Sequence, residues 1–267
     1  MIDNPSWQHF ATHDESEYPE LWRGVRGYWA SCLGPSGTRL HDVGGRNNWG
    51  TLTNMDAATD WVTDAGRYAL DFDGTDDFCD LPGTLSLARA TISCWCKLRV
   101  ATPTSASKTS PPFAQDSNNA ASHYTWTDGL IYIEALRNNR VTVTPSATVN
   151  RASWHLLTIS NNGIRYRVYQ NNILVHDSSA TAIPTSQFCI GRTRRLPDQV
   201  YWFDGLVSDA ILWDRGLSAN EVDQLYQIGR GGMLTPRRRR RAYFVQTFSP
   251  SWASGSNVVL QPSIGVS

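Results

Sequence analysis

Long apolar runs are missing from this sequence of 267 residues, although apolar side chains make up 40% of it. No stretch reaches the roughly 18 apolar residues that a membrane-spanning helix needs, so we expect no membrane partner. The first residues are polar and acidic and lack the basic end and apolar run of a secretory signal. Charged residues are sparse at 18%, while aromatic residues reach 11%. This balance excludes a chain that is disordered throughout.

Several catalytic and metal-binding motifs are also missing. The sequence has no Gly-x-Ser-x-Gly, no phosphate loop, no dinucleotide fingerprint and no CxxC pair. Its five cysteines are odd in number and do not suggest a disulfide framework. Cys94 and Cys96 alternate around Trp95, which places both thiols on one face of a strand as small buried side chains.

Positive charge gathers near the C-terminal end, where five arginines follow Pro236 and the residues before them carry a net charge of −5. The main body therefore lacks the field that attracts nucleic acid, and we expect no specific nucleic-acid partner. Apolar side chains after the arginines would gain from burial, which favours docking on an acidic protein surface over a solvated tail. The predicted docking residues are Arg237, Arg238, Arg239, Arg240, Arg241, Phe244 and Phe248.

Short alternating runs broken by Gly, Asn, Asp and Pro dominate the chain and predict strands. Two Asn-rich turns, at 161–163 and 170–172, predict an antiparallel meander over 154–176. Because strands dominate and β-α-β alternation is absent, the sequence predicts a sandwich or jelly roll. The predicted strands are 25–30, 67–72, 91–100, 130–134, 140–144, 154–160, 164–170, 172–176, 187–190 and 205–213.

One helix is predicted over 219–228, because Ser218 and Glu221 form a capping box before an apolar stripe. Residues 101–122 are rich in Ser, Thr, Pro and Ala and are predicted to be a long loop or insertion. The expected organisation is an N-terminal extension (1–20), one domain (21–233) and an Arg-rich C-terminal arm (234–267).

Five motifs follow one another along the chain: Gly24-Val-Arg-Gly-Tyr-Trp29, Asp42-Val-Gly-Gly-Arg-Asn-Asn-Trp-Gly50, Tyr68-Ala-Leu-Asp-Phe-Asp-Gly74, Phe203-Asp-Gly205 and Ile211-Leu-Trp-Asp-Arg-Gly-Leu-Ser218. This ordered set resembles the laminin-G-like jelly rolls of the concanavalin A-like lectin/glucanase superfamily. A looser resemblance, carried by Gly50-Thr-Leu-Thr-Asn-Met-Asp56 and the arginine run, is to laminin-G-like proteins of tailed phages and prophages. The resemblance implies an all-β fold: a two-sheet antiparallel jelly-roll sandwich with one short C-terminal helix and extended terminal arms.

The last strand departs from the family, because relatives often carry Asp-Glu where this chain has Ser208-Asp209. This departure puts in doubt any calcium site that the first of those acids supports in relatives. A separate group of acids, Asp73, Asp76 and Asp77, is dense enough to suggest calcium binding. The alternative is a simple turn whose acids face solvent.

The superfamily holds both lectins and glycosidases, so the fold alone does not give a function. Related glucanases use a Glu-x-Asp-x-x-Glu strand that this chain lacks, and its five Glu are scattered. His155 and His176 are expected to be structural or exposed. We therefore predict a protein that is not an enzyme, with a glycoside hydrolase as the least favoured reading.

Sugar binding requires exposed aromatic rings beside amides or carboxylates, because sugars offer apolar faces and hydroxyl edges. The segment His123-Tyr124-Thr125-Trp126-Thr127-Asp128 has this composition, and so does Trp49 beside Asn47 and Asn48. The candidate glycan-binding residues are Trp49, His123, Tyr124, Trp126 and Asp128. The alternative for each ring is packing in the core.

The favoured function is a structural protein of a tailed-phage virion, such as a capsid decoration, fibre or tail component. It would be assembled in the host cytoplasm with other virion proteins, form a homo-oligomer and display a domain that takes a glycan as ligand. A bacterial surface carbohydrate-binding module or adhesin is the alternative.

Overall fold

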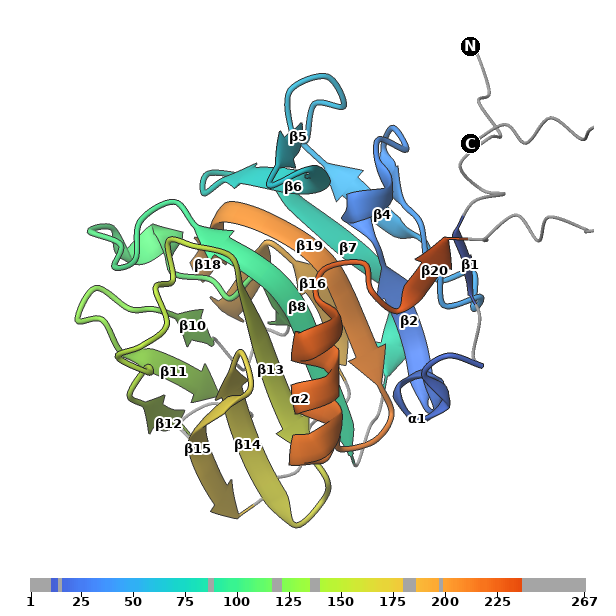
Figure 1. Ribbon diagram of the computed structural model, residues 1–267. Helices are drawn as coiled ribbons and strands as arrows, with labels where there is room; N and C mark the ends of the chain where they lie inside the picture. The colour runs from blue at the N-terminus through green and yellow to red at the C-terminus, as the bar shows by residue number, and fades with distance from the viewer. Residues whose placement is uncertain are drawn as a thin grey trace, which may run out of the picture. The chain divides into compact units, whose positions relative to one another are not determined.

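The computed structural model consists mainly of antiparallel strands (Figure 1). It describes residues 11–13, 16–85, 89–116, 122–134, 140–179, 186–196 and 199–236. The chain divides into units 1–237 and 238–267, and the second unit lies outside the described residues. The predicted fold class, an antiparallel sandwich with a short C-terminal helix, is confirmed.

An eight-stranded sheet forms one layer. Its members are β2 (Val25–Trp29), β5 (Trp61–Asp64), β6 (Arg67–Asp73), β8 (Ala90–Leu98), β13 (His155–Asn161), β14 (Arg165–Gln170), β15 (Ile173–Ser179) and β19 (Asp204–Trp213). The order is β15-β14-β13-β8-β19-β6-β5, and β2 also pairs with β19. The other layer has the order β3-β4-β7-β16-β9 and comprises β3 (Arg39–Leu40), β4 (Gly50–Thr53), β7 (Phe78–Leu85), β9 (Phe113–Asp116) and β16 (Ser186–Ile190).

Smaller elements complete the described part. One small sheet joins β10 (His123–Tyr124), β11 (Ile131–Glu134) and β12 (Arg140–Val143), and β17 (Arg192–Leu196) pairs with β18 (Gln199–Trp202). β1 (Ala11–His13) pairs with β20 (Leu234–Pro236). The helical elements are α1 (Pro19–Trp22), α2 (Ala219–Ile228), and the 3-10 turns η2 (Ser31–Leu33) and η3 (Ala106–Lys108).

The predicted meander is confirmed as β13, β14 and β15. Its turns form for local reasons: the Asn161 side chain accepts from the Gly163 amide, and that of Asn162 accepts from the Arg165 amide. Asn171 takes a positive φ in the next turn, as Asn tolerates. The predicted helix is also confirmed, because Ser218 and Glu221 cap α2 reciprocally.

The prediction of a long loop or insertion over 101–122 is wrong in part. This segment contains η3 and the edge strand β9, and Phe113 is buried in the core. The prediction missed β9 because Pro111 and Pro112 mask the short apolar run that follows them. Other strands that the sequence did not predict include β4, β5, β7, β17 and β18.

Two hydrophobic clusters lie on opposite faces of the eight-stranded sheet. Cys94 and Cys96 belong to the cluster between the two large sheets, whereas Trp95 belongs to the cluster beneath α1 and α2. Figure 1 shows α2 lying across the outer face of this sheet over β8 and β13. The two-residue side-chain period of β8 therefore separates the clusters, as the alternation predicts. All five cysteines are buried free thiols.

A bulge in β19 keeps this alternation in register. The strand's pairing with β8 shifts between Ser208 and Ile211, and Asp209 has a left-handed φ of 52°. Because β19 has one extra residue at this point, Ala210 and Leu212 face the cluster between the two large sheets. The same bulge buries the Asp209 carboxylate.

Candidate functional site

A loop over residues 42–49 is organised by one buried carboxylate. Oδ1 of Asp42 accepts hydrogen bonds from the amides of Tyr28 and Gly44, each at 2.9 Å, and Oδ2 accepts from the amide of Asn48 at 3.1 Å. Three N–H donors on one carboxylate explain why Asp stands at the start of this motif. The loop is held against β2 by its own sequence and by that strand.

The same loop borders a cavity of about 200 Å³. Trp29 lies at its base, and the Trp29 indole N–H donates to the Asn48 carbonyl at 2.6 Å. Two exposed arginines, Arg26 and Arg46, line the cavity. Neither arginine is among the site residues predicted from the sequence, although each lies within a motif that carries the family resemblance. The lining residues are Arg26, Trp29, Arg46, Asn48, Leu81, Pro82, Phe188 and Leu212.

Trp49 follows the loop and is 39% exposed, as a sugar-stacking residue needs to be. Its ring centroid lies 5.1 Å from that of His41, and the Arg39 guanidinium lies 5.2 Å from the Trp49 ring centre. Burial, and then the charge of Arg39, lower the pKa of His41. The indole is therefore steadied by two neighbours while part of it stays open to solvent.

The second predicted glycan segment is less exposed than its sequence suggests. His123 and Tyr124 are each only 1% exposed. The Thr109 hydroxyl lies 2.9 Å from Nδ1 of His123, and the Gln170 amide donates to the Tyr124 hydroxyl at 2.8 Å. The expectation that these two rings are exposed is wrong, because distant segments cover both faces of β10. Neither ring offers a face on which a sugar could stack.

Trp126 and Asp128 lie nearer the surface of the same segment. Trp126 is half-buried and packs edge-to-face on His123 and Tyr201, with ring centroids 4.4 and 6.2 Å away. Exposed Asp128 accepts from the Leu130 amide at 2.8 Å and from the Tyr132 hydroxyl at 2.6 Å, and the latter bond is the main reason for its lowered pKa. The structure thus brings an aromatic ring and a carboxylate into one turn.

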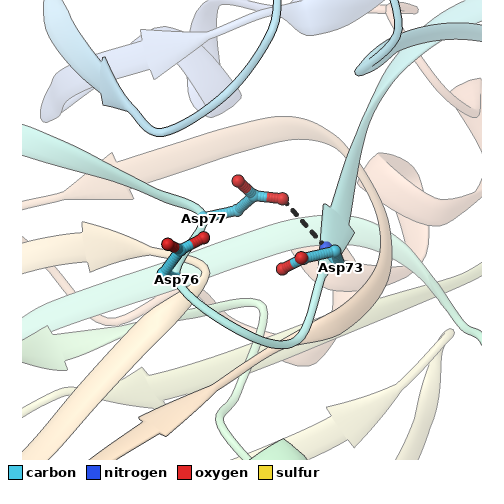
Figure 2. Close-up of side chains that lie close together, drawn as sticks. All are labelled: Asp73, Asp76 and Asp77. Carbon is cyan, nitrogen blue, oxygen red and sulfur yellow. Dashed lines mark hydrogen bonds between the residues drawn. The ribbon is translucent and has the colours of Figure 1, made fainter.

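Three carboxylates meet in the turn after β6 (Figure 2). One oxygen from each of Asp73, Asp76 and Asp77 lies within 4.8 Å of the others. Asp73 and Asp76 are exposed, whereas Asp77 is buried and accepts from the Asp73 amide at 3.0 Å. Burial, and then the neighbouring carboxylates, raise the pKa of Asp77 to about 6. These oxygen donors suit calcium, and calcium binding here stays a prediction.

Two cations already neutralise the acids next to this turn. The Lys108 ammonium donates to the Asp73 carbonyl at 2.8 Å and to the Asp204 carboxylate at 3.2 Å. Arg99 bridges Asp204 and Asp71. Any added cation would therefore act on the Asp76 and Asp77 side of the turn.

The departure in the last strand has a structural meaning. Asp209 is 3% exposed, and its carboxylate accepts from the Tyr28 hydroxyl, the Cys32 thiol, the Ser208 hydroxyl and the Gly231 amide. Protein donors occupy both oxygens. In this chain the acid joins elements of the fold and is not available as a ligand.

Two histidines, His155 and His176, are expected from the sequence to be structural or exposed. His155 is fully buried, and burial lowers its pKa to about 4. Its Nε2 lies 3.3 Å from the thiol of Cys96, whose pKa burial raises, so this pair lacks both access to solvent and a thiolate. His176 lies on the edge strand β15.

The predicted docking residues, Arg237 to Arg241 with Phe244 and Phe248, lie outside the described residues. No helix in the described part of the chain is long and apolar enough to cross a membrane.

Two antiparallel sheets packed face to face, with a capped C-terminal helix across one outer face, define a lectin-type jelly roll. The model of the concanavalin A-like lectin/glucanases superfamily matches residues 73–223, more than half of the chain. The chain belongs to this superfamily, and the resemblance drawn from its motifs is confirmed to that extent. No curated protein matches the sequence.

Solved structures share the architecture at low identity. Domain 4 of AbnA, an extracellular arabinanase of Geobacillus stearothermophilus in complex with arabinotriose, is 15% identical with a TM-score of 0.58; the match covers 82% of this chain and 100% of that one. Trypanosoma rangeli sialidase in complex with sialic acid is 16% identical (TM-score 0.55), covering 77% of this chain but 33% of the sialidase.

A botulinum neurotoxin type C structure, described in terms of cell entry through two ganglioside molecules, is 11% identical (TM-score 0.54). The match covers 78% of this chain and 52% of that one. At these identities the likeness to all three proteins shows the fold alone.

Proposed function

We propose that this domain binds glycans without cleaving them and serves as a surface-displayed structural protein of a tailed-phage virion. The observation that carries the glycan proposal is the position of Trp49 and Trp126, each accessible at the surface beside amides or a carboxylate. Domain 4 of the arabinanase, matched over its whole length, carries an arabinose oligosaccharide on a similar scaffold. Glycan binding needs a scaffold of this kind and accessible aromatic rings, and it needs no catalytic residues.

The arrangement of the acids favours binding over hydrolysis. Retaining glycosidases need two carboxyl groups about 5–5.5 Å apart, flanking a sugar. Among the described residues, Asp42 and Asp209 are tied up by protein donors, and the grouped acids of the turn after β6 lie outside the residues that line the cavity beside the 42–49 loop.

The virion role rests on the resemblance of the chain to laminin-G-like proteins of tailed phages. Five reduced, buried cysteines suit assembly in a reducing host cytoplasm before release. In this proposal the chain assembles as a homo-oligomer with other virion proteins.

A glycan array tests the binding proposal. We expect the wild-type protein to bind at least one glycan, and Trp126→Ala or Trp49→Ala to weaken that binding. Tyr68→Ala is the matched control, because Tyr68 is also 39% exposed but belongs to neither candidate site. Absence of binding to every glycan, or equal losses in all three variants, would contradict the proposal.

Sedimentation of purified particles tests the virion role. We expect the protein to co-sediment with intact virions in a fixed copy ratio. Glycan binding by a protein that is absent from virions would instead favour a bacterial surface carbohydrate-binding module.

A further inference from the structure

The cavity beside the 42–49 loop has an apolar base and a cationic mouth. Its base consists of buried side chains from both large sheets, namely Trp29, Leu81, Phe188 and Leu212. The volume of about 200 Å³ is below the roughly 300–1,000 Å³ of pockets that enclose drug-sized ligands. It suits one ring of a ligand.

The mouth carries an excess of positive charge. Arg26 pairs with Asp214 at 2.6 Å, whereas Arg46 makes no hydrogen bond or ion pair with any residue that the structure describes. Both arginines line the same cavity, and among the described residues the carboxylate of Asp214 is the one that forms an ion pair with either of them. An anion would supply the missing partner.

The rim is set in place before any ligand arrives. Asn48 is fixed three times: its amide N–H donates to Asp42, its side chain donates to the Arg26 carbonyl at 2.8 Å, and its carbonyl accepts from Trp29. This loop conformation therefore costs little ordering on binding. Arg46 lies on the same short loop, two residues before this anchor.

We propose that this cavity binds the terminal hexuronic acid of an acidic glycan. The carboxylate would lie between the guanidinium of Arg46 and that of Arg26, and the C–H face of the pyranose ring would rest on the apolar base. This proposal depends on the glycan-binding function proposed above and adds the class of sugar.

Two features favour a carboxylated sugar over other anions. The planar guanidinium fork matches a carboxylate with two parallel hydrogen bonds. A small inorganic anion would leave the apolar base in contact with water, whereas a pyranose ring would cover it. A neutral sugar would use the base but leave Arg46 without a partner.

Titrations of the full chain with matched pairs of sugars provide the test. Methyl glucuronide and methyl galacturonide are each compared with the neutral methyl glucoside and methyl galactoside by ligand-observed NMR. We expect at least one uronide to bind about tenfold more tightly than its neutral counterpart, because a hydrogen bond to a charged group is lost in the latter. Added salt should weaken only uronide binding.

Variants locate the site. Arg46→Gln should weaken uronide binding about tenfold without changing the melting temperature, because Arg46 has no described partner to lose. Arg46→Lys should restore part of the affinity, since it keeps the charge but not the fork. Arg89→Gln is the matched control: it removes the same charge from an exposed arginine that does not line the cavity and does not contact Trp49, and it should leave uronide binding unchanged.

The outcomes separate the two proposals. If neutral glycans bind on the array but no uronide is preferred, this inference is overturned and the glycan-binding function stands. Equal losses in Arg46→Gln and Arg89→Gln would also overturn it, because the effect would then be one of net charge. If no glycan binds at all, the proposed function itself fails.

Discussion

Replacing Asp209 tests how strongly a single buried carboxylate holds this fold together. Its four donors come from separate parts of the chain: Tyr28 on β2, Cys32 in η2, Ser208 on β19, and Gly231 after α2. The distances run from 2.8 to 3.2 Å. Removing the acceptor would leave several of these donors buried and without a partner.

The expected magnitude follows from those donors. The Gly231 amide belongs to the backbone and cannot turn away, and Tyr28 is only 1% exposed. Each donor left without a partner therefore costs about 1–3 kcal/mol. The substitution also removes the cost of burying the Asp209 carboxylate, and this offsets part of the loss in stability. We therefore expect Asp209→Ala to lower the free energy of unfolding by about 3 kcal/mol, and Asp209→Asn, which keeps one acceptor and tolerates the left-handed φ, by about 1–2 kcal/mol.

Guanidinium denaturation followed by tryptophan fluorescence measures this difference. A loss of about 3 kcal/mol corresponds to a fall in melting temperature of roughly 6–12 °C for a domain of this size. Asp223→Ala is the control, because Asp223 is exposed on α2 and bonds only to exposed Asn172 and Gln227 side chains. If Asp209→Ala is no less stable than this control, the carboxylate does not join these elements and the reasoning is wrong.

Three further outcomes are expected. The pKa of Asp77 is raised from an ordinary 3.8 to about 6. Between about pH 4 and pH 6 the folded protein therefore holds a proton on Asp77 that the unfolded chain has lost, so this group makes the fold less stable as the pH rises through that range. His155, with a pKa lowered to about 4, acts in the opposite direction. The difference between wild type and Asp77→Asn isolates Asp77: the variant should be more stable above pH 6, by on the order of 1 kcal/mol after solvent screening, and equal near pH 4. Gly205→Ala should fold poorly or lose several °C in melting temperature, because Gly205 has a φ of +148° and an added Cβ would lie 2.3 Å from the Lys97 carbonyl oxygen; an unchanged melting temperature would contradict this. Because all five thiols are buried, a thiol reagent should react with none of them in the native protein and with five after unfolding, and fast native reaction of even one would refute that packing.

The sequence predicted those elements whose determinants are local. The meander follows from two Asn turns, and α2 follows from the reciprocal cap of Ser218 and Glu221. In contrast, β7 was missed because Pro82 and Gly83 interrupt it, at a point where its pairing with β16 shifts register. A strand of this kind is stabilised by pairing with neighbouring strands of the sheet. Those strands are distant in the sequence, so a short stretch of sequence does not reveal them.

The same limit explains the outcome at the candidate glycan residues. His123 and Tyr124 lie at successive positions of β10, so alternation alone would leave one of them outside. His123 is instead covered by Thr109 and Tyr201, and Tyr124 by Gln170. These covering residues are as many as 78 positions away from the ring that they cover. Exposure is thus the property of a site that sequence predicts least well.

The position of α2 also restricts where a glycan could bind. On the eight-stranded sheet, Val222 and Leu225 of α2 cover the face that carries Trp95 and Trp213, and the opposite face is filled by the core. Where α2 and the core cover it, the eight-stranded sheet therefore leaves no broad face free for a long polysaccharide. Loops at the margins of the sheets are also accessible, and the 42–49 loop presents Arg46 beside a cavity large enough for one sugar ring. A cavity of this size would favour the end of a glycan chain over its middle. The arginines that line it would favour a terminal sugar with a negative charge over a neutral one.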